Sequence, residues 1–113
     1  MRSKKARLRS KADRAMQEYI RANNKGCFVC GQPISCGHHY FPKSTASSLR
    51  YDLDNIIPLC QGCHFRHHNG DPRIHATVLE IKGIDWHKEL LRKKNILVKP
   101  GIKYYEEIIN KFK

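Results

Sequence analysis

The chain has 113 residues, and its 22 lysines and arginines against 10 aspartates and glutamates give a net charge of +12. A chain of this length builds one core rather than two independent domains. Hydrophobic residues make up 40% of it, so we expect a globular protein whose one-signed charge suits a polyanionic partner, nucleic acid first. No segment approaches the roughly 20 apolar residues of a membrane span, and the N-terminus lacks the apolar stretch of a signal peptide. We therefore expect a cytoplasmic protein with no membrane partner.

Residues 1–25 are predicted to form a basic N-terminal arm. Apolar side chains recur there at helical spacing and predict a helix over about 10–24, with Ser10 as its N-cap and Asn24 and Gly26 at its end. The polar face of this helix is mostly cationic. It is either a solvated face or a surface that contacts phosphates, and both interpretations stay open.

Residues 26–70 contain two C-x2-C pairs, Cys27 with Cys30 and Cys60 with Cys63. Four thiolates at this spacing are typical of a tetrahedral structural zinc site, which adds on the order of 10 kcal/mol in favour of a small folded domain. The alternatives are two disulfides, which a reducing compartment disfavours, or four buried thiols. Cys36 has no partner at this spacing and is interpreted as a free thiol, with substitution as a zinc ligand as the alternative.

Histidines lie between and just after these pairs. His64 and His68 are separated by four residues on a predicted helix, so both imidazoles project from one face and suit a single metal ion. His67 is expected to point elsewhere, toward solvent or a phosphate. His38 and His39 are neighbours on a predicted strand, where adjacent side chains face opposite ways, so only one of them can face the metal squarely.

Residues 71–113 are predicted to be a helical extension. Three apolar sets at helical spacing are separated by Gly83 and by Pro100 with Gly101. These stripes are core or docking surfaces. The third set is the surface that we would expect in a possible homodimer; its members are Tyr104, Tyr105, Ile108, Ile109 and Phe112.

The order His-His, Asn, His, His, between and just after two C-x2-C pairs, resembles the HNH nucleases of the ββα-metal class, in which two antiparallel strands and a helix hold one divalent cation. More closely, the sequence resembles phage recombination proteins of the NinG/Rap family; the matching segments are Gly-His-His-Tyr-Phe-Pro-Lys-Ser from Gly37, Leu-Arg-Tyr-Asp from Leu49, Asn69-Gly70 and the helical tail. The resemblance implies an α+β fold: a zinc-stapled ββα-metal core at 26–70, with a basic N-terminal helix and a helical C-terminal tail.

The resemblance also implies roles for individual residues. His39 would be the general base, with His38, His64 and His68 as ligands of the catalytic metal; the reverse assignment of His38 and His39 stays open. Asn55 would hydrogen-bond across the loop between the strands and hold the base in position, the alternative being an ordinary turn asparagine. The reaction would be one-metal hydrolysis of a phosphodiester bond, leaving 5′ phosphate and 3′ hydroxyl ends.

Three imidazoles favour transition metals, yet an open site with phosphate ligands is compatible with the expected Mg²⁺ or Mn²⁺; Zn²⁺ or Ni²⁺ are alternatives. Lys43, Arg50 and Arg66 are candidates for nucleic-acid contacts, the alternative being ordinary surface cations.

These features predict an HNH DNA endonuclease, and the tail favours a phage recombination nuclease that acts on branched DNA in the bacterial host cytoplasm. A non-specific, packaging-associated or homing-type nuclease is an alternative. A non-catalytic zinc-ribbon module or a structural assembly protein would explain the charge and the cysteines, but not the histidine spacing.

Overall fold

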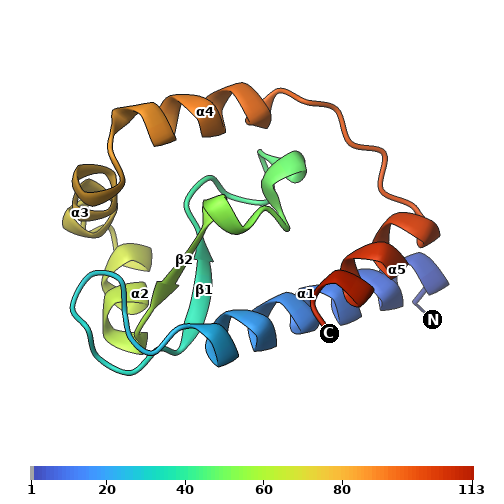
Figure 1. The fold of residues 1–113 in the computed structure, drawn as a ribbon, viewed down its shortest axis with the longest axis horizontal. Helices are drawn as coiled ribbons and strands as arrows, with labels where there is room; N and C mark the ends of the chain where they lie inside the picture. Colours follow the sequence, from blue (N-terminus) through green and yellow to red (C-terminus); the bar gives the residue numbers. More distant parts are fainter. Residues whose placement is uncertain (1) are drawn as a thin grey trace.

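The structure, a computed structural model, describes residues 2–113 and combines helices with one small antiparallel sheet, as the α+β prediction requires (Figure 1). In chain order the elements are α1 (Lys4–Asn23), β1 (Cys36–His39), the 3-10 turns η1 (Ser47–Leu49) and η2 (Leu53–Asn55), β2 (Ile56–Leu59), α2 (Gln61–His68), α3 (Arg73–Lys82), α4 (Ile84–Lys94) and α5 (Ile102–Lys111). None of the helices in residues 2–113 has the length and apolar character needed to cross a membrane.

Helix α1 is longer than the sequence pattern predicted. It begins at Lys4 rather than near residue 10, because its first turns consist largely of good helix formers. The N-cap is Ser3, whose side chain accepts a hydrogen bond from the Ala6 amide at 3.1 Å. The prediction of Ser10 as the cap is therefore wrong, since Ser10 lies inside the helix.

The sheet pairs β1 with β2 in antiparallel register, with Cys36 opposite Leu59 and His39 opposite Ile56. Helix α1 packs directly on β1 at Gly37, where a Cβ atom would lie 3.2 Å from the Ile20 Cγ1 atom of α1 and 2.6 Å from the Ile56 Cγ2 atom of β2. The Gln17 side chain fixes this approach: its oxygen accepts from the Gly37 N–H at 2.7 Å, and its nitrogen donates to the Gly37 carbonyl at 2.8 Å. The edge strand that carries the histidines is thus held by a side chain of α1.

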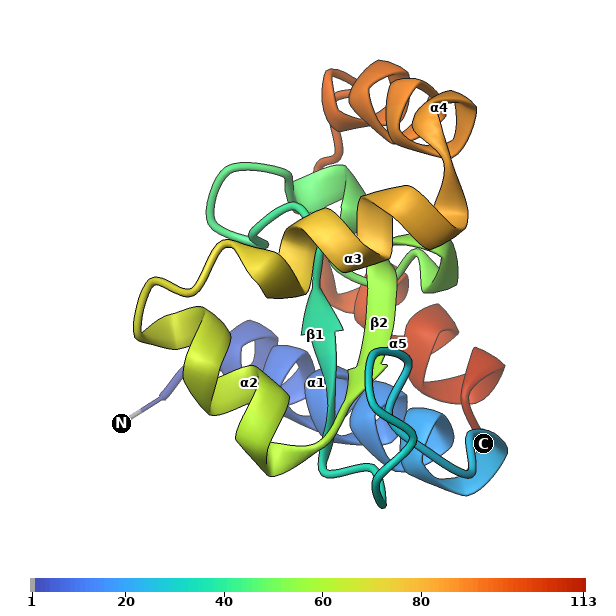
Figure 2. The same ribbon diagram turned by 90° about the vertical axis from the view of Figure 1, so that its left-hand side faces the viewer.

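Helices α2 and α3 lie on one side of the strands, and α1 and α5 lie on the other (Figures 1 and 2). The tail is helical as predicted, with α3 and α4 divided at Gly83, whose φ of 95° ends α3. Helix α5 packs against α1. Tyr105 of α5, and Phe112 just after it, are buried with Met16 and Ile20 of α1. The apolar face that we expected in a homodimer is therefore covered within the chain.

Candidate active site and metal centres

The four cysteines of the C-x2-C pairs converge beside the start of α2. Their sulfur atoms all lie within 4.8 Å of one another, and the Cys30 sulfur is 3.5 Å from that of Cys60 and 3.7 Å from that of Cys63. All five cysteines are free thiols, so the disulfide alternative is wrong. Four convergent sulfurs fit a tetrahedral structural zinc ion.

The charge state of these thiols supports the same interpretation. Burial opposes a thiolate at Cys27, but hydrogen bonds from the backbone of Cys60, Cys30 and Val29 outweigh it and lower its pKa to about 6. Burial and the neighbouring thiols raise the pKa of Cys63 to about 12. Four thiolates can share this small space only around a cation, and zinc binding would release their protons.

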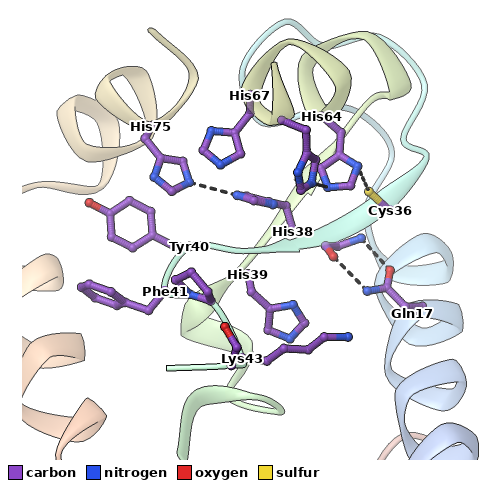
Figure 3. Close-up of a pocket in the computed structure, with 14 residues that line it drawn as sticks. Gln17, Cys36, His38, His39, Tyr40, Phe41, Lys43, His64, His67 and His75 are labelled. Carbon is purple, nitrogen blue, oxygen red and sulfur yellow. Dashed lines mark hydrogen bonds between the residues drawn. The ribbon is translucent and has the colours of Figure 1, made fainter. Parts of the chain in front are cut away.

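A cavity of about 890 Å³ lies between β1, α2 and α3, and histidines line it (Figure 3). His38 on β1 and His64 and His68 on α2 place their ligand atoms within 4.8 Å of one another. The Nε2 atoms of His64 and His68, one helical turn apart, are separated by 2.8 Å. The structure thus brings together the three side chains predicted to hold the catalytic metal.

The same His38 belongs to a second triad, with His67 and His75, whose ligand atoms also lie within 4.8 Å of one another. The Nε2 atoms of His38 and His75 are 2.9 Å apart. The rings of His67 and His75 stack at 4.1 Å, and the His67 ring lies 4.6 Å from that of His38. His67 therefore faces the cavity rather than open solvent, and its alternative role as a phosphate contact stays a prediction.

Sequence reasoning missed the second triad. His75 follows the predicted core by five residues and was assigned no role, because only the fold of the α2–α3 turn brings it over His38. The available signal was the concentration of histidines between positions 38 and 75.

Burial keeps these imidazoles neutral. Together with the neighbouring histidines it lowers the pKa of His38 to about 3, and burial and His67 lower that of His75 to about 4. Burial also lowers the pKa of His64 and of His67. The neutral imidazole is the form that binds metal, and no aspartate or glutamate is among the described residues that line the cavity.

His39 lies outside both triads of the described chain but lines the same cavity. Its Nε2 atom is 2.8 Å from the Arg50 carbonyl oxygen, which can only accept, so the ring proton resides on Nε2 and Nδ1 is left as an acceptor. Burial lowers the pKa of His39, although the bond to this carbonyl opposes the shift. His39 is therefore a neutral imidazole with one basic nitrogen free.

Asn55 is fully buried and closes the loop between the strands. Its side-chain oxygen accepts from the Phe41 N–H at 2.9 Å. Its nitrogen donates to the carbonyls of Phe41 at 3.1 Å and of Leu49 at 3.3 Å. Both ends of the loop that carries the Arg50 carbonyl are thereby tied to one side chain.

Two of the three predicted nucleic-acid cations are engaged elsewhere. The Arg50 guanidinium donates two hydrogen bonds to Asp13, at 2.9 and 2.6 Å. Arg50 contacts the cavity residue His39 through its backbone carbonyl instead. Arg66 donates to the Cys63 sulfur at 3.0 Å, on the cysteine side of α2. Lys43 lines the cavity. The interpretation of Arg50 and Arg66 as DNA contacts stays a prediction.

Cys36, for which the sequence predicted no partner, lies beside the first triad. Its sulfur is 3.4 Å from the His64 Nδ1 atom, and burial raises the pKa of its thiol. A ligand histidine is commonly oriented by a partner at its other ring nitrogen. Cys36 occupies that position and leaves the His64 Nε2 atom for a metal.

Comparison with known proteins supports nuclease chemistry for this part of the chain. Residues 27–70, less than half of the chain, match the family described as HNH endonuclease. The chain is also 38% identical over 50 residues to anaredoxin of Nostoc sp. (strain PCC 7120 / SAG 25.82 / UTEX 2576). That alignment covers 42% of this chain and 63% of the length of anaredoxin. No solved structure matches the chain.

The residues matched to the HNH endonuclease family include both cysteine pairs, His38, His39, Asn55, His64 and His68. His75 falls outside the matched segment. The match does not distinguish subfamilies, so the likeness to NinG/Rap proteins stays a prediction.

Proposed function

We propose that the protein is a metal-dependent DNA endonuclease that hydrolyses phosphodiester bonds. The observation that carries this proposal is the convergence of His38, His64 and His68 in the cavity that also holds the free Nδ1 of His39. A zinc-ribbon binding module would need only the cysteine cluster. The HNH match over residues 27–70 points in the same direction.

In this proposal His39 is the general base. Its Nδ1 atom takes a proton from a water molecule, which attacks phosphorus in line with the leaving oxygen. The low pKa keeps the ring neutral and ready to accept that proton at physiological pH. The proton gained at Nδ1 makes the ring a cation, and the Arg50 carbonyl 2.8 Å from Nε2 stabilises that charge.

Asn55 is a positioning residue in the same proposal. It bonds to Phe41 and Leu49 and so fixes the loop on which the Arg50 carbonyl lies. The Asp13–Arg50 ion pair holds that loop against α1. The orientation of His39 therefore depends on side chains that do not touch the substrate.

His38, His64 and His68 would hold the catalytic ion, which when bound stabilises negative charge on the phosphate and on the departing 3′ oxygen. Three neutral nitrogens without a carboxylate fit Mn²⁺ or another transition metal better than Mg²⁺. We therefore expect higher activity with Mn²⁺ than with Mg²⁺. The cysteine cluster holds a separate structural zinc ion.

The substrate that we propose is DNA, in view of the net charge of +12 and of Lys43 at the cavity. We further propose a branched substrate and a role in phage recombination, as the tail resemblance implies. A homing, packaging or non-specific nuclease is the alternative, and cleavage assays on different DNA structures discriminate between them.

The test compares cleavage of a labelled four-way junction with that of a linear duplex of the same sequence, in Mn²⁺, in Mg²⁺ and with a chelator. His39→Ala should slow cleavage by about 10²–10⁴-fold without weakening DNA binding. The control is Glu80→Gln, which changes an exposed side chain of α3 that does not line the cavity. Equal cutting of both substrates would discard the branched-DNA role. Tight DNA binding with no metal-dependent cutting would favour the zinc-ribbon module.

A further inference from the structure

The second histidine triad has the features of a metal site rather than of ordinary packing. His38, His67 and His75 come from three elements, β1, α2 and α3, and their nitrogens converge within 4.8 Å. Most side-chain hydrogen bonds in proteins go to the backbone or to water rather than to another side chain. Here the close partner of the His38 Nε2 atom is another imidazole nitrogen, that of His75 at 2.9 Å.

The neighbourhood of the triad is rigid and has little charge. The His75 ring is stacked between His67 at 4.1 Å and Tyr40 at 4.7 Å, so its direction is fixed without a metal. No carboxylate is among the described residues of the cavity. A donor set of three neutral nitrogens selects Zn²⁺, Ni²⁺ or Cu²⁺ and disfavours Mg²⁺.

We propose that His38, His67 and His75 form a second transition-metal site, and that an ion bound there withdraws His38 from the site formed with His64 and His68. Both triads need His38, so the two histidine sites exclude each other. The occupied second site is an inhibitory state for the nuclease. This regulatory part rests on the proposed function, whereas the metal site itself does not.

His38 lies at least as close to the rings of the second site as to those of the first. The His38 ring centroid is 4.6 Å from that of His67 and 5.2 Å from that of His75, compared with 5.3 Å for His64 and 6.0 Å for His68. An imidazole-seeking ion such as Zn²⁺ therefore meets a nearly formed second site. An ion that accepts phosphate oxygens, such as Mn²⁺, is drawn to the first site when DNA is bound.

The binding test uses the full chain with its structural zinc already loaded. In the double variant His64→Ala/His68→Ala the first site is absent, and Zn²⁺ binding is measured by calorimetry and Co²⁺ binding by absorption. We expect one further ion to bind. Adding His75→Ala should weaken that binding by at least about tenfold, and adding Glu80→Gln, an exposed position on the same helix, should leave it unchanged. Unchanged affinity after His75→Ala would overturn the proposal.

A second variant guards against misfolding. His67 is only half-buried and its backbone lies within α2, so His67→Ala should keep the helical circular dichroism signal and still weaken binding by at least about tenfold. In the intact protein we expect one histidine-bound ion, not two, because His38 is shared. Two tightly bound ions beyond the structural zinc would refute the mutual exclusion.

The regulatory part is tested in cleavage assays with Mn²⁺ and increasing Zn²⁺. The intact protein should lose activity at a Zn²⁺ concentration at least about tenfold lower than the His75→Ala variant does. Equal inhibition of both proteins would refute regulation through the second triad. If neither protein cleaves DNA, the proposed function fails, and the calorimetric result still decides the metal site.

Discussion

Asn55→Ala removes the side chain that closes the loop between β1 and β2. It leaves the Phe41 N–H buried without an acceptor, which costs about 1–3 kcal/mol, and it takes a donor from two carbonyls. We expect a total loss of about 3 kcal/mol in the free energy of unfolding. For a chain of this size that corresponds to a fall of roughly 10 °C in the unfolding midpoint.

The assay is thermal unfolding of the zinc-loaded protein, followed by circular dichroism. The matched control is Asn23→Ala, because the Asn23 amide is exposed and bonds only to the Tyr19 carbonyl one turn earlier. Its effect should stay within about 0.5 kcal/mol. Asn55→Asp keeps the acceptor but turns an oxygen toward two carbonyls, so it should destabilise at least as much as Asn55→Ala at neutral pH. If the Asn55 variants unfold at the same temperature as Asn23→Ala, this account of the loop is refuted.

Three further predictions concern the packing, the ion pair and the zinc. Gly37→Ala puts a methyl group 2.6 Å from Ile56 of β2 and 3.2 Å from Ile20 of α1, and should cost about 1–3 kcal/mol. Gly101→Ala has open space around it and should cost less than about 1 kcal/mol, from the N-cap position alone; equal midpoints would contradict the close packing around Gly37. Burial opposes the charge of Asp13, but hydrogen bonds from Arg50 and Tyr51 outweigh this effect and lower the pKa of its carboxyl group. The Asp13 carboxylate therefore stabilises the fold fully above its unfolded pKa of about 3.9, and this stabilisation is lost as the pH falls through the lower pKa of the folded state. Denaturation measured between pH 7 and pH 3 should show a smaller loss of stability in Asp13→Asn than in the intact protein, and identical losses would speak against this pairing. Finally, a chelator that removes zinc should abolish the helical circular dichroism signal of the cysteine-containing core, and excess zinc should restore it. A protein that stays folded without metal would show that the fold does not depend on zinc at the four cysteines.

The parts of the site that could be predicted from the sequence are the local ones. The two C-x2-C pairs and the His64–His68 pair depend on spacings within one turn or one helix, so the chain itself fixes their geometry. The structure brings each of these groups together as expected. The division of the tail at Gly83 was also readable, because a glycine at positive φ ends a helix.

The parts that could not be predicted depend on contacts between distant segments. Arg50 pairs with Asp13, and Cys36 lies beside His64, only because α1, β1 and α2 pack together in this way. The position of His75 over His38 depends on the direction in which α3 leaves the α2–α3 turn. No motif in the sequence connects Arg50 with Asp13, Cys36 with His64, or His75 with His38.

Helix α2 links the two metal centres. Its N-cap is Cys60, whose sulfur accepts the Cys63 N–H at 3.3 Å, so the cysteine cluster fixes the first turn of the helix. His64 follows Cys63 directly, and its position therefore depends on the same turn. A short helix of eight residues has little stability of its own and needs such an anchor. A zinc ion held by the cysteines would therefore act on the proposed catalysis at a distance. It would fix the orientation of His64 and, through the rest of α2, that of His67 and His68, on which the proposed choice between the two histidine sites depends.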